Sequence, residues 1–210
     1  MKFRRPRRRR IPRSIRFPRR ARALAWIALA ASASIGLVGY DHWSRRATGG
    51  DVSRYHDRTF RVVRVIDGDT LDIDCPDDGD TTTRIRLWGI DTPEVGLGNT
   101  RAMYFGEEAQ DFAEHRLYQR DVHLVLVGER TRDKYGRLLA YVFLQRGGPM
   151  FNELILEEGY AYADRRFEHP WRRNFEALEI RARRQQAGLW SGVRIDDMPP
   201  WRQRLERGKE

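Results

Sequence analysis

Two aspartates stand at the ends of predicted strands, where their side chains could bind one cation. Asp69 lies in the turn of VIDGDT, and Asp91 follows the apolar run of RLWGID. Carboxylate oxygens suit hard divalent ions such as Ca²⁺ or Mg²⁺, and the sequence offers no cluster of His or Cys that would favour a softer metal. Asp-Gly is also ordinary hairpin-turn chemistry, so the spacing alone leaves both interpretations open.

Two arginines and a glutamate could act on a phosphate ester beside such a cation. The guanidinium groups of Arg86 and Arg137 could each hold two phosphate oxygens and stay charged at every relevant pH. Glu94, three residues after Asp91, could orient or deprotonate an attacking water. Each of these residue types is also common as a solvated surface charge, so none assigns a function by itself.

Five strands and three helices are predicted to position these side chains. Apolar alternation predicts strands at 59–66, 71–74, 84–90, 122–127 and 138–144. Helical spacing predicts helices at 104–119, 150–158 and 173–186. The first three strands follow one another with no helix between them, which favours a Greek-key barrel over a parallel sheet. We therefore predict an α+β fold, mainly β, built on a five-stranded OB-fold barrel with three helices.

The charge of the chain is unevenly distributed. Residues 1–46 hold 14 Lys and Arg and one acid, whereas the rest of the chain holds 26 bases and 29 acids. Because the body has a slight negative excess, it must bind a polyanion through a few placed cations rather than through its overall field. The single cysteine, Cys75, excludes an intramolecular disulfide and a Cys-based zinc site.

The N-terminal part predicts attachment to a membrane. Residues 1–22 are basic and interrupted by prolines, which predicts a disordered arm. Residues 23–40 carry no charge and as a helix would span roughly 27 Å, which predicts a transmembrane signal anchor followed by a linker at 41–58. The basic arm would stay cytoplasmic, so the body at 59–190 would be extracytoplasmic. A signal peptide cut near 31–33, with a secreted product, and a buried core helix remain as alternatives.

Six segments in order resemble staphylococcal nuclease (thermonuclease) and its homologues. They extend from residue 59 to 190 and leave 191–210 as an unmatched segment, which we expect to form an extended surface tail. The matching segments are VIDGDT (65–70), RLWGIDTPE (86–94), YFGEEA (104–109), RDKYGRLLAY (132–141), NELILEEGYA (152–161) and GLW (188–190).

The resemblance implies a Ca²⁺-dependent endonuclease, for which another hard divalent cation would also suit, that cuts DNA or RNA at the 5′-O–P bond and leaves 3′-phosphates. It implies that the metal is bound by two carboxylates and one backbone carbonyl, that two arginines clamp the phosphate and that a glutamate activates the water. The residues that match these positions are Asp69, Asp91 and Thr92 for the metal, Arg86 and Arg137 for the phosphate, and Glu94 for the water.

The resemblance also implies residues that contact the nucleotide. Lys134 and Tyr135 match positions that contact its terminal phosphate. Where the family has tyrosines after the second helix, this chain has Arg165 and Phe167, so Phe167 could stack on a base. We expect a monomer. The alternative is a non-catalytic OB-fold module that binds single-stranded nucleic acid or a protein, but such a module should have a basic face, and the negative body favours chemistry.

Overall fold

The computed structural model describes residues 50–96 and 102–208. The predicted basic arm at 1–22 and the predicted anchor at 23–40 lie outside the described residues, which belong to the unit Arg46–Glu210. Among the described helices, none is both long and apolar enough to cross a membrane.

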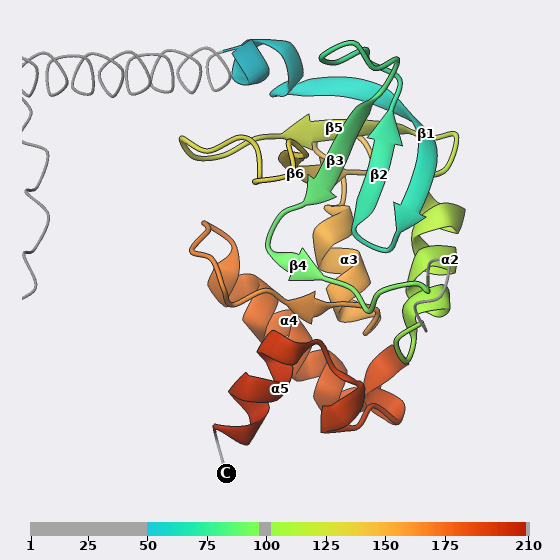
Figure 1. The fold of residues 1–210 in the computed structure, drawn as a ribbon, viewed down its shortest axis with the longest axis vertical. Helices are drawn as coiled ribbons and strands as arrows, with labels where there is room; N and C mark the ends of the chain where they lie inside the picture. Colours follow the sequence, from blue (N-terminus) through green and yellow to red (C-terminus); the bar gives the residue numbers. More distant parts are fainter. Residues whose placement is uncertain (1–49, 97–101, 209–210) are drawn as a thin grey trace, which may run out of the picture. The chain divides into compact units, whose positions relative to one another are not determined.

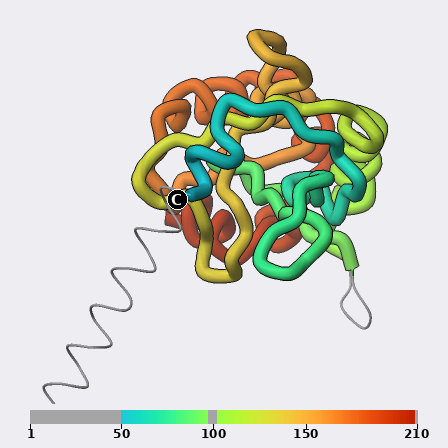
Figure 2. The backbone as a smooth tube through the Cα atoms, turned by 90° about the horizontal axis from the view of Figure 1, so that it is seen from above, coloured from blue at the N-terminus to red at the C-terminus, as the bar shows by residue number. Residues whose placement is uncertain are grey.

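Five strands form a closed barrel in the order β1-β2-β3-β6-β5 (Figure 1). Neighbouring strands are antiparallel, except that β3 and β6 are parallel. Seen from above, the chain from β1 to β6, coloured blue to yellow, curves around a common interior (Figure 2). The predicted five-stranded barrel is confirmed. Its strands are β1 (Arg58–Asp67), β2 (Thr70–Ile73), β3 (Thr83–Leu87), β5 (Asp121–Val125) and β6 (Leu138–Phe143).

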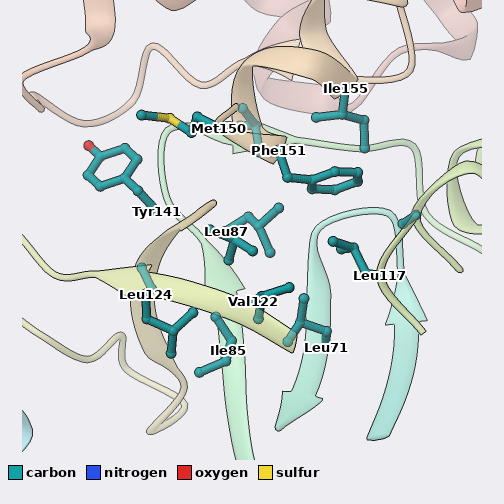
Figure 3. Close-up of a cluster of buried hydrophobic side chains, with 14 of the residues drawn as sticks. Leu71, Ile85, Leu87, Leu117, Val122, Leu124, Tyr141, Met150, Phe151 and Ile155 are labelled. Carbon is teal, nitrogen blue, oxygen red and sulfur yellow. The ribbon is translucent and has the colours of Figure 1, made fainter. Parts of the chain in front are cut away.

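One cluster of buried side chains joins the barrel interior to a helix above it. Leu71, Ile85 and Leu87 come from β2 and β3, and they share this cluster with Phe151 and Ile155 of α3 (Figure 3). Burial of each such side chain contributes about 1.5–3 kcal/mol. The cluster therefore fixes β2 and β3 in place, and Asp69 directly precedes β2 while Arg86 belongs to β3.

The three predicted helices are confirmed, with ends one or two residues from those expected. They are α2 (Gly106–Leu117), α3 (Phe151–Glu157) and α4 (Arg172–Gln185). Helix α2 packs on β1, and α3 packs between β6 and α4. The apolar positions of α2 follow the helical repeat, with Ala109, Ala113 and Leu117 buried.

The predicted third strand is divided in two. It was expected to run through residues 84–90, but β3 ends at Leu87, and β4 (Ile90–Asp91) pairs with β7 (Tyr162–Ala163) outside the barrel. Gly89 makes the turn with φ of 82°, and a Cβ there would lie 2.5 Å from Cε1 of His169. Only glycine tolerates both conditions, so the chain leaves the barrel at this point and carries Asp91 with it.

The described part of the predicted linker is packed rather than free. Residues 50–55 are helical, and Tyr55 is buried with its hydroxyl 3.0 Å from Oγ1 of Thr83. Asp51 is also buried and accepts a hydrogen bond of 2.7 Å from Nη2 of Arg132. Residues 50–55 therefore belong to the folded body, and the prediction of a linker is wrong for them. The buried carboxylate of Asp51 needs the hydrogen-bond partners that the barrel supplies.

The prediction of an extended C-terminal tail is also wrong. The described part of the predicted tail, residues 191–208, contains the short 3₁₀ helix η2 (Ile195–Asp197) and the helix α5 (Pro200–Arg207). Both follow the 3₁₀ helix η1 (Gly188–Ser191). Arg202 of α5 is fully buried and forms an ion pair with Glu179 of α4 at 2.5 Å. Sequence periodicity does not reveal such a helix, because its buried side is charged and apolar residues are few.

Candidate active site

Arg86 brings the two predicted metal ligands together. The register of β2 and β3 sets Thr70 opposite Arg86, so Asp69, one residue earlier, lies beside the end of β3. Nη1 of Arg86 lies 2.7 Å from Oδ2 of Asp69, and Nη2 lies 2.7 Å from Oδ1 of Asp91. All three side chains are largely buried. Two carboxylates from distant turns therefore converge on one guanidinium.

The turn between β1 and β2 holds Asp69 against Thr92, the residue that follows β4. Oδ2 of Asp69 accepts a 2.8 Å hydrogen bond from the backbone N–H of Thr92, and Oδ1 accepts one of 3.0 Å from the hydroxyl of Thr70. A Cβ at Gly68 would lie 2.7 Å from Cγ2 of Thr92, so a larger residue would separate the two segments. Burial raises the pKa of Asp69 to about 6, although Arg86 acts in the opposite direction.

Asp91 and Glu94 are further carboxylates in the same cluster. Burial raises the pKa of Asp91, and the positive charge of Arg86 offsets this only in part. Burial also raises the pKa of Glu94, and the negative charges of Asp69 and Asp91 raise it further. Glu94 lies within the electrostatic influence of Arg86 and Arg137 as well. The raised pKa values follow from three carboxylates that share a poorly solvated space.

The backbone of Glu94 is held by the start of α2. Its carbonyl accepts a 2.9 Å hydrogen bond from the N–H of Met103. A Cβ at Gly106 would lie 2.4 Å from the same carbonyl oxygen, which only a glycine permits. Helix α2 therefore fixes where Glu94 lies relative to the strands that carry the aspartates.

Arg137 enters the cluster from the loop between β5 and β6. Its Nε donates a 2.7 Å hydrogen bond to Oδ2 of Asp133, which fixes the plane of the guanidinium. Its Nη1 lies 3.4 Å from Oγ1 of Thr70, the hydroxyl that also contacts Asp69. The structure thus brings Asp69, Arg86, Asp91 and Arg137 together in one cluster.

The predicted nucleotide-contacting residues flank the cluster and are exposed. Tyr135 is 71% exposed, with Nζ of Lys134 at 4.8 Å and Cζ of Arg137 at 5.5 Å from its ring centroid. Phe167 is 53% exposed, and Cζ of Arg166 lies 5.8 Å from its ring centroid. Each aromatic ring therefore stands beside an arginine of the cluster and remains open to a ligand.

Two residues of the cluster were missed by the sequence analysis. Nη2 of Arg166 lies 2.9 Å from Oδ1 of Asp91, and Nε1 of Trp201 donates a 2.7 Å hydrogen bond to its Oδ2. Arg165, which stands where the family has a tyrosine, lies instead 3.6 Å from Glu176 and from Glu179 on α4. No sequence signal distinguishes Arg166 from its neighbour, and Trp201 lies 110 residues from Asp91.

The oxygen atoms in this cluster suit a hard divalent cation as ligands. Asp69, Asp91 and Glu94, whose pKa values are raised by burial, share this space with Arg86, Arg137 and Arg166, and carboxylate oxygens are the ligands that a hard cation prefers. Across the described residues, no three His, Cys, Asp or Glu side chains are arranged as a complete metal cage. The chain would therefore offer one or two carboxylates and backbone carbonyls, with water for the rest, a ligand set that suits a hard divalent cation such as Ca²⁺ or Mg²⁺.

Comparison with known proteins decides the family. The family model described as staphylococcal nuclease homologue matches residues 84–192. A thermonuclease of Staphylococcus hyicus is 37% identical over 143 residues, which cover 67% of this chain and 80% of that protein. The chain belongs to the staphylococcal nuclease family. A micrococcal nuclease of Shigella flexneri is 31% identical over 187 residues, which cover 86% of this chain and 94% of that protein.

The part of the chain that matches the family model contains most of the cluster. Arg86, Asp91, Glu94 and Arg137 fall inside the matched residues, whereas Asp69 precedes them and Trp201 follows them. Staphylococcal nuclease homologues are generally dependent on a divalent cation, in agreement with the carboxylate oxygens gathered in the cluster.

Proposed function

We propose that the chain is a Ca²⁺-dependent endonuclease that hydrolyses DNA or RNA at the 5′-O–P bond and leaves 3′-phosphates. That it is an enzyme, a nuclease of the hydrolase class, follows from its family. The observation that supports the finer proposal best is the pairing of Asp69 and Asp91 with one guanidinium, at 2.7 Å each. The cluster joins acidic oxygens for a cation with arginines for a phosphate, and both are needed for phosphodiester hydrolysis.

Arg86 and Arg137 would bind the phosphate. Among the described residues, Arg86 uses Nη1 and Nη2 for the aspartates and for the carbonyl of Leu87, and Nε has no acceptor. Arg137 uses Nε for Asp133 and retains Nη2. These N–H groups can donate to phosphate oxygens, where negative charge grows as water adds. When bound beside them, a cation supplies additional positive charge that stabilises the same oxygens.

Glu94 would take the proton from the attacking water. Burial and two neighbouring carboxylates raise its pKa, which makes the ionised side chain a stronger base than a free glutamate. Lys134 and Tyr135 would contact the terminal phosphate of the nucleotide, and the exposed ring of Phe167 would stack on a base.

Cleavage assays on the full-length chain test this proposal. Single-stranded DNA and RNA are incubated with Ca²⁺, with Mg²⁺ or with a chelator, and the product ends are tested for phosphatase-sensitive 3′-phosphates. We expect cleavage with Ca²⁺ and none with the chelator, and the reaction with Mg²⁺ shows whether another hard cation can replace Ca²⁺. Asp69→Asn serves as the inactive control, because it removes a charged ligand and keeps the shape. Equal inactivity with Ca²⁺ and chelator, or products that end in 3′-hydroxyl, would contradict the proposal.

Cation affinity should fall as the pH is lowered. Asp69 must be ionised to bind, and burial places its pKa at about 6. Protons and cations compete for the same carboxylate, so the Ca²⁺ dissociation constant should be about tenfold higher at pH 5 than at pH 7. Calorimetric titration at both pH values measures this change, and Asp69→Asn should show weaker binding with a smaller pH dependence. Equal affinity of the unsubstituted chain at pH 5 and pH 7 would be inconsistent with the assignment.

The membrane anchor remains a proposal that rests on the sequence. Residues 23–40 carry no charge and follow a strongly basic arm, a combination that favours an inner-membrane anchor with the barrel on the extracytoplasmic side. We expect the full-length chain to sediment with membranes and to resist alkaline extraction, and a variant without residues 23–40 to stay in the supernatant. Release of the full-length chain as a shortened soluble product would indicate the alternative, signal cleavage and secretion.

A further inference from the structure

The C-terminal helix contributes a residue to the cluster. Trp201, on α5, donates a 2.7 Å hydrogen bond from Nε1 to Oδ2 of Asp91. The residue lies beyond residues 84–192, which match the family model. In Figure 1, α5 lies at the same end of the fold as α4 and the β4–β7 pair.

Asp91 is held at both of its carboxylate oxygens. Oδ1 lies 2.7 Å from Nη2 of Arg86 and 2.9 Å from Nη2 of Arg166, whereas Oδ2 contacts Nε1 of Trp201. An ionised carboxylate accepts about four hydrogen bonds, two at each oxygen. The donors in the described part of the chain therefore fill Oδ1 and leave one acceptor position on Oδ2. That oxygen is the one available to a cation, and Trp201 sets its direction.

The ring of Trp201 is itself fixed in place. Cζ of Arg166 lies 4.8 Å from the centroid of the ring, and Nε of the same arginine donates 2.8 Å to Oδ1 of Asp164. The indole is therefore held between its stacked arginine and its hydrogen bond to Asp91. A ring with these two contacts has little freedom to release the carboxylate.

Helix α5 and strand β4 are anchored to the same framework. Arg202, next to Trp201, is fully buried and donates from Nη1 and Nη2 to the carboxylate of Glu179 at 2.9 and 2.5 Å. Oε2 of Glu179 also accepts a 2.8 Å hydrogen bond from the N–H of Ala163 in β7. Since β7 pairs with β4, which carries Asp91, both ends of the Trp201–Asp91 contact are fixed relative to each other.

From this geometry we infer that Trp201 is a positioning residue, which orients Oδ2 of Asp91 toward a divalent cation and makes α5 part of the active site. The inference rests on the proposed function in taking Asp91 as a cation ligand. Residues that hydrogen-bond to metal ligands typically change metal affinity by 10–100-fold when they are replaced. Trp201 therefore acts on cation binding, and through it on cleavage, without contacting the substrate.

Trp201→Phe tests the inference, because it retains an aromatic ring and removes the N–H. We expect its Ca²⁺ dissociation constant, measured by calorimetry on the full-length chain, to be tenfold or more higher. The Ca²⁺ concentration for half-maximal cleavage should rise in parallel, whereas kcat at saturating Ca²⁺ should change less than threefold. A structural defect would lower kcat and the active fraction without this shift in Ca²⁺ dependence.

Trp190→Phe is the matched control. The indole Nε1 of Trp190 is buried and has no hydrogen-bond partner among the described residues, so this variant removes an N–H that holds nothing. We expect its Ca²⁺ affinity to equal that of the unsubstituted chain. If Trp201→Phe fails to fold, benzothienylalanine at position 201 provides the same test, because it retains the bicyclic ring and lacks the N–H.

Two outcomes separate this inference from the proposed function. If the unsubstituted chain binds Ca²⁺ and Trp201→Phe binds it tenfold more weakly, the inference holds even if no nucleic acid is cleaved. If Trp201→Phe binds Ca²⁺ as tightly as the unsubstituted chain, or more tightly, the inference is overturned even if cleavage continues. Failure of the unsubstituted chain to bind Ca²⁺ would overturn it as well.

Discussion

Replacing Glu94 by Gln lowers kcat for nucleic-acid hydrolysis by a factor of about 10²–10⁴, the range expected for loss of a general base. The amide keeps the shape of the side chain but cannot accept the proton of the attacking water. The effect should be large here because burial and the charges of Asp69 and Asp91 raise the pKa of Glu94, so the ionised group is a strong base. Single-turnover cleavage at saturating Ca²⁺ measures the chemical step apart from binding.

The control for this experiment is a glutamate outside the cluster. Glu157 of α3 lies on the surface, 3.3 Å from Arg181, and Glu157→Gln should leave kcat unchanged. Binding of a nucleic acid to Glu94→Gln should change little, since the role that we propose for Glu94 is to act on water rather than on the phosphate. A kcat within threefold of the unsubstituted chain would assign the base to another group. If the unsubstituted chain binds nucleic acid without cleaving it, and Glu94→Gln binds it equally well, the alternative of a non-catalytic binding module would be favoured.

The second large effect is expected for Arg137→Lys, with kcat lower by about 10²–10³, or about 3 kcal/mol of lost transition-state stabilisation. The guanidinium of Arg137 is held by Asp133 at 2.7 Å through Nε, and its Nη atoms extend toward Thr70. The planar guanidinium thus keeps its hydrogen bond to Asp133 and can still donate to a phosphate oxygen. A lysine offers a single charged nitrogen, which cannot occupy both places.

Steady-state kinetics on a short oligonucleotide separates this loss from weaker binding. Because the interaction strengthens as charge grows in the transition state, kcat and kcat/KM should fall together while KM changes little. Arg146→Lys is a suitable control, since Arg146 is 71% exposed and pairs with Asp57. A kcat for Arg137→Lys within tenfold of the unsubstituted chain would show that positive charge suffices and that the fork of the guanidinium has no catalytic part.

Most strands and helices of the barrel follow from the sequence, because they depend on local patterns. Alternating apolar residues give strands, apolar residues at helical spacing give helices, and both patterns report which face of a short segment is buried. The predicted ligands Asp69 and Asp91 stand at the ends of such strands, and the hairpin brings Asp69 beside Arg86 through the register of neighbouring strands. The hairpin is a short-range relation, but spacing alone leaves the role of these aspartates open, and the resemblance of six ordered segments to a known family singles them out.

The tertiary structure decided what depends on the path of the chain. The departure from the barrel at Gly89, the buried pair of Arg202 and Glu179, and the hydrogen bond from Trp201 to Asp91 each involve segments that are distant in sequence. Hydrophobic patterns count an arginine or a glutamate as exposed, so they cannot indicate a helix that is anchored by buried charges. The residues that we propose to act on the phosphate are therefore indicated by the sequence and its family resemblance, whereas the residues that hold them in position appear only when the fold brings them together.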